Sequence, residues 1–512
     1  MMPEGTEVEA FFSAYEFKDS YNGSPWRCFA STTGNTARPL FGKTVGWMRA
    51  KILERRNEMY RVEWAGPFID PFKKEVHWRV RFWVPREGVR PLATAERPAV
   101  SLLMVQWYDY KTDTRKSEYK IQSEYAMRSL IEENGMRDAF GKNFEVFTLY
   151  VQHSGCLENF DPGECFALMK GDHKVACYYL WPCERNNIDP TTHPAMVSCN
   201  SYFPMVQRVE SCGIHTKFPL PSRLHQFICG KQYYLLCDAA EYKLPLTATV
   251  HYQAVRSDSS EAARAAIRVL ELAKQRLEGS SDARVAAGVV KLGFSWMGCD
   301  VLKWAGQPSL EKQLEKIFER NPGQIGTTCI VQELVADLIC EMRVNVFAID
   351  DENYLKKIVY VKMSKHEDRG AGFEMASSEM MDALEAYNTV WKENKEMQEY
   401  AENMALELTD KWLLLIKRQW PDQGSPCSFR FDYMVGWKEG RDPVLRTVEL
   451  TEPGSSLCWI PDGIKLRNAA LVNSFLTTVR PDRRPAGFQP LPVWDTTGGD
   501  CGWLSNAPRW NR

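Results

Sequence analysis

Two acidic side chains lie in neighbouring strand-like runs near the carboxyl end of this 512-residue chain. Asp432 lies in the run 429–435 and Glu449 in the run 447–454, and each has apolar neighbours. A carboxylate buried among apolar groups is costly unless a cation or a hydrogen-bond donor compensates it. A shared divalent cation would compensate both, since Mg²⁺ is usually held by carboxylate and phosphate oxygens. The alternative is two carboxylates on solvent-facing strand positions.

Two lysines upstream are candidate partners for an anion. Lys231 lies in a predicted helix over 222–237, and Lys291 lies in a predicted strand that begins at 289 and runs into a glycine-bearing turn. Lysine ammonium groups neutralise phosphate charge and donate hydrogen bonds to it. The alternative for Lys231 is an ordinary surface lysine, whereas the valines and leucine beside Lys291 favour a buried position.

A third charged feature is the pair Glu341 and Arg343, in a strand-like run over 341–348 that is predicted to pair with 358–363. Side chains two residues apart on a strand face the same side of the sheet. The pair therefore suits either partners that bind each other or an arginine that reaches a phosphate. An ordinary cross-strand ion pair is the competing interpretation.

The period of the apolar side chains predicts the elements that position these residues. Period two with Gly and Pro between the runs predicts a small antiparallel barrel over 40–92. The other predicted elements are strands over 101–110, 144–151, 175–180 and 329–335 and helices over 124–133, 260–277 and 378–420. The sequence therefore predicts a multidomain α+β or α/β chain, in which the role of 93–190 stays open.

The order of the charged residues resembles the ATP-grasp superfamily over residues 195–478. The ordered series is Lys231, Lys291, the run 332–335, Glu341-x-Arg343, Asp432 and Glu449. The resemblance implies two α/β subdomains that clamp ATP, preceded by an α/β pre-domain near 140–225. It implies ATP as cofactor, with Mg²⁺ or Mn²⁺.

The resemblance also implies a role for individual residues. Lys231 and Lys291 would bind phosphate, and the loop 293–298 with Ser295 would cover the triphosphate. Arg343 and Lys291 would offset charge at the transferred phosphate. The hinge at the adenine edge would comprise Gln332, Glu333, Leu334 and Val335, with Asp337 accepting from the ribose hydroxyls; Asp337 as an exposed turn residue is the alternative.

The implied metal ligands are Asp432 and Glu449, with Thr451 and Glu452 as weaker candidates. Family members commonly carry an Asn two residues after the second acid, and here that position is Thr451. Glu452 would point to the opposite face of a regular strand and would reach the site only if the strand ends in a bulge. The loop 293–298 is also bulkier than the glycine-rich loops of many members.

Most members of the superfamily are ligases, so the resemblance implies an ATP-dependent carboxylate–amine ligase that forms an acylphosphate. The substrate would be a small molecule or a peptide with a carboxylate or an amine. Two alternatives stay open: a kinase that phosphorylates a hydroxyl, and a degenerate nucleotide-binding adaptor.

The amino-terminal barrel predicted over 40–92 resembles a Tudor or Agenet-type module. Lys and Arg outnumber Asp and Glu by 12 to 6 over 41–92, which suits contact with a protein tail or a nucleic acid. Trp47, Tyr60, Trp64 and Trp78 would form an aromatic cage for a cation, stack on bases, or belong to the barrel core.

The composition of the chain indicates which partners and which cellular location to expect. A net charge of −2 gives no global reason to expect nucleic acid as the main partner, and no apolar run reaches the roughly 20 residues of a membrane span. With no CxxC pair and no signal-like start, we expect a cytoplasmic protein, nuclear residence included. The predicted domains are 1–95, 96–225 and 226–478, followed by a disordered tail over 479–512.

Overall fold

The computed structural model describes most of the chain between residues 2 and 476. The described ranges are 2–13, 31–32, 40–70, 75–94, 96–107, 128–131, 135–183, 195–279, 283–293, 301–319, 328–335, 337–350, 353–362, 380–420, 426–453, 457 and 460–476. The chain forms two compact units, the first within Met1–Trp181, Ile188–Ser222 and Asn468–Pro492 and the second centred on Arg223–Arg467. The predicted tail over 479–512 and Ser295 lie outside the described residues.

The first unit is built on one mixed sheet, in which ten of the described strands take part. Its parallel strands are β7 (Val100–Trp107), β8 (Phe144–Val151), β9 (His173–Tyr179) and β12 (His215–Phe218). Its antiparallel strands are β1 (Glu7–Ser13), β2 (Ser31–Thr32), β3 (Leu40–Arg56), β4 (Met59–Asp70), β5 (Glu75–Pro85) and β6 (Val89–Pro91). The strands predicted over 101–110, 144–151 and 175–180 are therefore confirmed as β7, β8 and β9.

The long strand β3 joins the two halves of this sheet. Its first residues pair with β8 of the parallel half, and its later residues pair with β4 of the antiparallel half. The amino-terminal strands consequently continue into the α/β sheet, and a separate closed barrel of the Tudor type is not shown. The basic composition of this region is partly neutralised by ion pairs such as Arg90 with Glu9 and Arg81 with Glu63.

The aromatic side chains proposed for a cage have different surroundings. Tyr60 and Trp64 are buried in the core between β1, β3, β4 and β5. Trp47 packs edge-on against Phe11 and carries the guanidinium of Arg90 at 4.3 Å from its ring centroid. The core interpretation is therefore right for Tyr60 and Trp64, and the Trp78 side chain lies outside the described residues.

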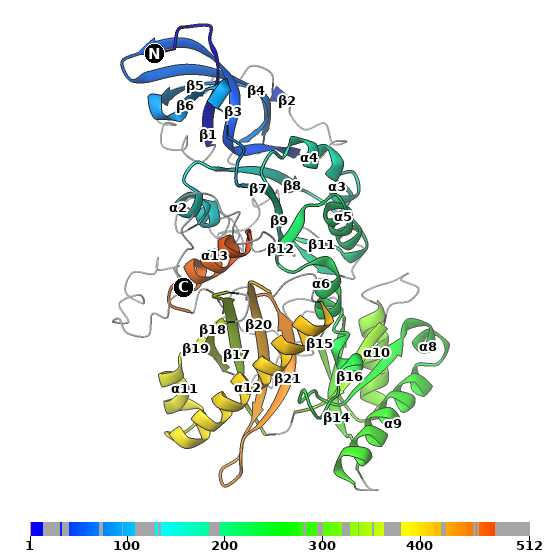
Figure 1. Cartoon of the computed structure of the whole chain (residues 1–512). Coiled ribbons are helices and arrows are strands. Elements are labelled where there is room, and N and C mark those ends of the chain that lie inside the picture. The colour runs from blue at the N-terminus through cyan, green and yellow to red at the C-terminus, as the bar shows by residue number, and fades with distance from the viewer. Residues whose placement is uncertain are drawn as a thin grey trace. The chain divides into compact units, whose positions relative to one another are not determined.

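Short helices accompany the parallel half of the sheet. They are α2 (Met136–Phe140), α3 (Gly155–Glu158), α4 (Pro162–Leu168) and α5 (Cys199–Ser211) (Figure 1). The helix α4 begins where Asp161 accepts hydrogen bonds from Gly163 N and Glu164 N and where proline occupies the first helical position. The described residues of region 96–222 therefore form an α/β part of the chain that shares its sheet with the amino-terminal strands.

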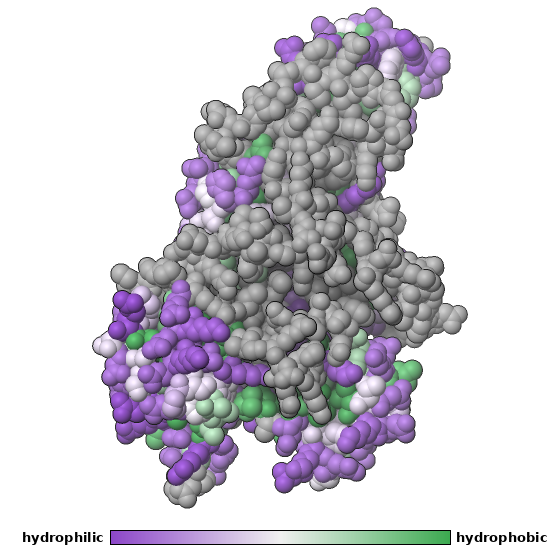
Figure 2. Space-filling view, turned by 180° about the vertical axis from the view of Figure 1, so that it is seen from behind, coloured by the Kyte–Doolittle hydropathy of each residue, from purple (hydrophilic) through white to green (hydrophobic). Residues whose placement is uncertain are grey.

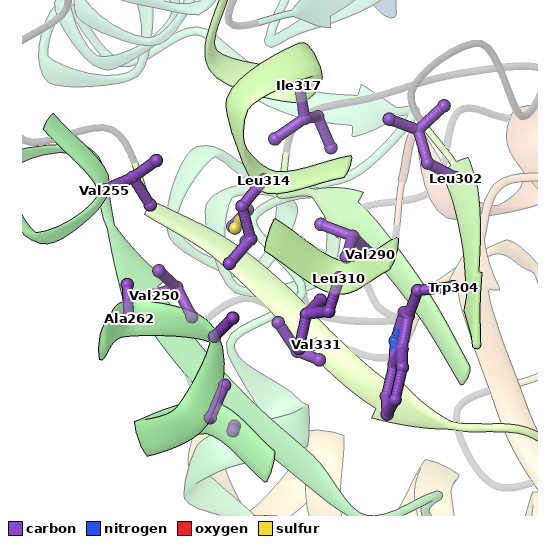
Figure 3. Close-up of a cluster of buried hydrophobic side chains, with 14 of the residues drawn as sticks. Val250, Val255, Ala262, Val290, Leu302, Trp304, Leu310, Leu314, Ile317 and Val331 are labelled. Carbon is purple, nitrogen blue, oxygen red and sulfur yellow. The ribbon is translucent and has the colours of Figure 1, made fainter. Parts of the chain in front are cut away.

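The second unit contains a sheet that we call the β14 sheet, with strand order β13-β16-β14-β15. Its antiparallel strands are β13 (Thr247–His251), β14 (Ala287–Leu292), β15 (Val301–Ala305) and β16 (Thr328–Glu333). The helices α8 (Tyr252–Ser257), α9 (Ser259–Glu278) and α10 (Gln307–Glu319) pack against it. Figure 3 shows Leu310 and Leu314 of α10 next to Val290 and Val331 of the sheet. Each such buried aliphatic side chain contributes about 1.5–3 kcal/mol.

A further sheet of this unit, called the β20 sheet, has the order β19-β18-β17-β20-β21. Its antiparallel strands are β17 (Leu338–Ala348), β18 (Tyr354–Lys362), β19 (Met380–Met381), β20 (Ser428–Gly436) and β21 (Val444–Thr451). The helix α12 (Lys395–Gln419) packs on one face, where Thr409 Oγ1 lies 2.8 Å from Tyr433 Oη. The prediction of a multidomain α/β chain with two α/β subdomains in its second half is confirmed (Figure 1).

Two helices are shorter than predicted. The helix predicted over 378–420 is divided into α11 (Ala383–Thr389) and α12, because Lys392 and Glu393 take positive φ values of 50° and 63°. Asn394 then begins α12 by accepting a hydrogen bond from Met397 N. The helix predicted over 222–237 is likewise divided, into α6 (Ser222–Cys229) and α7 (Tyr233–Leu236).

Among the described helices, none is both long and apolar enough to cross a bilayer. On the face shown in Figure 2, hydrophilic side chains predominate among the coloured residues, with smaller apolar groups between them.

Candidate functional site

The β20 sheet carries charged side chains on the face opposite to α12. Cross-strand pairing aligns Arg343 of β17 with Asp432 of β20, and Asp432 in turn with Glu449 of β21. The next row aligns Asn345, Arg430 and Thr451. Side chains directly opposite each other on adjacent strands share a face. The predicted acidic pair is thus brought together on one face.

Asp432 is buried between two arginines. Arg430 binds it in a bidentate manner, with Nε to Oδ1 and Nη2 to Oδ2 both at 2.8 Å, and Arg343 Nε lies 3.9 Å from Oδ2. Arg343 Nε also donates to Glu341 Oε1 at 2.6 Å, so the predicted Glu341–Arg343 pair forms. Burial raises the pKa of Asp432 to about 7, and the two arginines oppose that rise.

Three further candidate ligands, Glu449, Thr451 and Glu452, lie near Arg430 at the end of β21. The Glu449 side chain is 31% exposed, and its Oε2 lies 3.6 Å from Arg430 Nη2. Because β21 ends at Thr451, the Glu452 side chain turns back and accepts a hydrogen bond from Thr451 Oγ1 at 2.6 Å. Burial raises the pKa of Glu452, while Arg430 opposes that rise.

This donor set suits a cation that keeps non-protein ligands. Asp432 and Glu449 each retain oxygen lone pairs beyond their contacts with Arg430, since a carboxylate has about four acceptor sites. In the ranges that the structure describes, no three His, Cys, Asp or Glu side chains are grouped as a metal cage. Mg²⁺ is typically held by one or two carboxylates together with phosphate oxygens and water. The residues present therefore fit Mg²⁺ bound with a polyphosphate.

Lys231 lies in the turn between α6 and α7, and not within a helix. Lys231 N donates to Ile228 O and Gln232 N donates to Phe227 O, both at 3.0 Å, which is a Schellman motif with Lys231 at the position that glycine usually takes. Its φ of 53° costs about 1–2 kcal/mol for a residue with a Cβ. The buried Nζ donates to Leu292 O at 3.2 Å and to Gly293 O at 2.5 Å, at the end of β14.

Lys291 is buried beside the end of β14, as the sequence predicts. Its Nζ donates to Tyr234 Oη at 2.9 Å and lies 4.6 Å from the centroid of that ring. Burial and the nearby Lys231 together lower the pKa of Lys291 to about 7, and Glu449 opposes that change. Two buried lysines that repel each other next to a carboxylate form a local environment suited to an anion and its cation.

Two residues of this site, Arg430 and Tyr234, were not predicted from the sequence. Arg430 supplies the main compensation for Asp432, and Tyr234 donates a hydrogen bond to Val448 O on β21. Arg430 could have been predicted as a partner of Asp432, because it lies two residues before Asp432 on the same strand and the two side chains therefore share a face. Tyr234 stands three residues after Lys231, and no local pattern marks it.

The predicted hinge residues lie at and just after the end of β16, and the backbone N–H groups of two of them have partners. Glu333 N donates to Leu246 O at 3.2 Å, and Leu334 N donates to Ala287 O at 3.1 Å. Gln332 is buried and donates to Thr247 Oγ1 at 2.8 Å.

The apolar side chains of the hinge are more accessible. Leu334 is 49% exposed and Val335 is partly buried. Asp337 is exposed, has a φ of 50°, and its carbonyl accepts from Trp437 N. Recognition of adenine and ribose by residues 332–337 stays a prediction.

Three solved synthetases or ligases are similar to this chain. The D-cycloserine synthetase DcsG is 16% identical, with 73% of this chain and 99% of that chain covered and a TM-score of 0.43. D-alanyl-alanine synthetase A from Vibrio cholerae is 13% identical, with 75% and 100% covered and a TM-score of 0.44. The VanG D-Ala:D-Ser ligase from Enterococcus faecalis is 13% identical, with 74% and 100% covered and a TM-score of 0.42.

No family model and no curated protein sequence matches the chain. The TM-scores of the solved structures are too low to assign an activity, a substrate or a site residue here.

Proposed function

We propose that the chain is an ATP- and Mg²⁺-dependent ligase that joins a carboxylate to an amine through an acylphosphate. The observation that carries this proposal is that Lys291 is linked through Tyr234 to the acidic strand β21. Its Nζ contacts Tyr234 Oη, Tyr234 contacts Val448 O, and Glu449 acts electrostatically on the lysine. These contacts support a site in which Lys291 of the β14 sheet and the carboxylates of the β20 sheet bind one nucleotide together.

The chain's own residues would act chiefly by placing charge. Lys231 and Lys291 would bind phosphate oxygens, and Arg343 with Arg430 would add positive charge beside Asp432. Mg²⁺, when bound by Asp432 and Glu449 with Thr451 and Glu452 nearby, supplies positive charge beside the phosphates.

The reaction would proceed in two steps. The substrate carboxylate attacks the γ-phosphorus, the bond to ADP breaks, and an acylphosphate forms. The amine nitrogen then attacks the acyl carbon, the carbon–oxygen bond to phosphate breaks, and the nitrogen loses a proton. The electrostatic setting of the site supports both steps, since each develops negative charge on phosphate oxygens.

The test is a screen for ADP release with pairs of small carboxylates and amines, run in parallel with polyols. Glu449→Gln is the site variant, and Glu439→Gln, on the exposed β20–β21 connection, is the matched control. We expect ADP release that needs a carboxylate plus an amine, is lost in Glu449→Gln and is kept in Glu439→Gln.

Each other outcome has a definite meaning. Phosphate transfer to a polyol would replace the ligase with a kinase. Binding of a Mg²⁺–ATP analogue without turnover would favour a degenerate nucleotide-binding adaptor. Equal behaviour of wild type and Glu449→Gln in every arm would refute an ATP-using site here.

A further inference from the structure

Tyr234 joins the two sheets of the second unit through one hydroxyl group. It lies in the single turn of α7, three residues after Lys231, and its side chain is buried. Its oxygen accepts a hydrogen bond from Lys291 Nζ of β14 at 2.9 Å. Its proton is donated to Val448 O of β21. The distance from Lys291 to the acidic strand is therefore set by one phenol group.

The ring of Tyr234 adds a second contact with the same lysine. Lys291 Nζ lies 4.6 Å from the ring centroid, within the range of a cation–π interaction. The neighbouring Tyr233 ring packs on Tyr234 with centroids 4.5 Å apart. Because the Tyr234 ring is held by this packing, it presents a fixed acceptor and a fixed ring face to the lysine.

The charged groups that face Lys291 are Lys231 from the turn before α7 and Glu449 from β21. Lys231 donates to the carbonyls of Leu292 and Gly293. Because an ammonium group has no acceptor atom, Lys231 cannot accept a hydrogen bond from Lys291. A buried ammonium needs an acceptor. Tyr234 Oη provides it, and it does so on the side of β21.

We propose that Tyr234 is a positioning residue. Its hydroxyl group holds Lys291 Nζ beside β21, so that the lysine contacts the phosphates of a nucleotide bound at this acidic strand. The phosphate ligand in this inference rests on the proposed function. The lysine contact rests on the hydrogen bonds themselves.

The experiment is a double-mutant cycle on nucleotide affinity. Tyr234→Phe, Lys291→Met and the double variant are titrated with a non-hydrolysable ATP analogue and Mg²⁺. We expect Tyr234→Phe to weaken binding about tenfold, the scale of one lost hydrogen bond to a charged group. In the Lys291→Met background the same change is expected to have no further effect. Losses that multiply in the double variant, or wild-type affinity in Tyr234→Phe, would overturn the inference.

A matched control and a second readout separate this inference from the proposed function. Tyr252→Phe removes a phenol hydroxyl on α8 of the same unit and is expected to leave binding unchanged. The same cycle is also measured by urea unfolding without nucleotide, where Tyr234 and Lys291 are expected to be coupled. Coupling near zero would overturn the Tyr234 inference and leave the proposed function standing. A wild-type protein that fails to bind the analogue would overturn both the proposed function and the role of Tyr234 in phosphate binding.

Discussion

Arg430 and Asp432 stand two residues apart on β20 and form a bidentate ion pair, with both nitrogen–oxygen distances at 2.8 Å. The pair lies on the face of the sheet where Glu449 and Thr451 also lie. Arg430 Nη1 in addition donates to Pro453 O at 3.3 Å, just beyond the end of β21. Arg430 therefore connects β20 with the segment that carries three of the candidate metal ligands.

Replacing Arg430 by methionine is expected to destabilise the protein by about 3–5 kcal/mol, because the Asp432 carboxylate then stays buried without its main counter-charge. Urea unfolding of the variant measures this loss. The double variant Arg430→Met/Asp432→Asn, which removes the charge as well, is expected to recover much of it. Equal stability of the two variants would show that Asp432 does not depend on Arg430.

The free energy of unfolding is expected to depend on pH because the pKa of Lys291 differs between the folded and the unfolded protein. Burial lowers its pKa to about 7 in the folded protein, whereas the pKa of a lysine in the unfolded chain is about 10.4. Between these values the unfolded state binds more protons, so this lysine makes the free energy of unfolding rise with pH.

Measuring the free energy of unfolding at several pH values between about 7 and 10 tests this expectation. Lys291→Met is expected to flatten the rise, and Lys312→Met, an exposed lysine on α10, is expected to leave it unchanged. Parallel curves for wild type and Lys291→Met would contradict a lowered pKa.

A buried ion pair in the first unit is expected to hold its sheet halves together. Lys43 Nζ of β3 lies 2.5 Å from Glu145 Oε2 of β8, and Ser101 Oγ donates to Glu145 Oε1 at 2.5 Å. Burial lowers the pKa of the Lys43 ammonium, and Glu145 opposes that change. Glu145→Gln would leave the ammonium buried without a counter-charge, at a cost of about 3–5 kcal/mol.

Thermal unfolding of Glu145→Gln gives this cost. The double variant Lys43→Met/Glu145→Gln provides the comparison, and it is expected to be less destabilised than Glu145→Gln alone. A Glu145→Gln protein as stable as wild type would show that the ion pair is unimportant for the junction of β3 with β8.

Gly288 is expected to tolerate no side chain. A Cβ at this position of β14 would lie 1.8 Å from Gln332 O and 2.9 Å from the Trp304 ring. Gly288→Ala must therefore push β16 away from β14, and we expect a lower melting temperature and weaker binding of an ATP analogue. Val289→Ala, at the next position of the same strand, serves as the comparison because it adds no atoms. A Gly288→Ala protein that melts at the wild-type temperature would show that β14 and β16 separate without cost.

The sequence alone determined which residues share a face of a strand. Glu341 and Arg343 meet because side chains two residues apart on a strand point to the same side, and this depends on local geometry only. Asp432 and Glu449 come together for a related reason, since two adjacent strand-like runs in one chain readily pair. The buried position of Lys291 also follows from its apolar neighbours in the sequence.

The tertiary structure decided what compensates each buried charge. From the sequence we predicted that a metal ion compensates the charge of Asp432. In the fold Arg430 forms an ion pair with it, because packing determines which side chain lies within reach of a buried carboxylate. The fold likewise places Lys231 in a left-handed turn and Tyr234 between two sheets. These positions depend on contacts between residues about 60 to more than 200 apart along the chain, and no local pattern of apolar and polar residues encodes them.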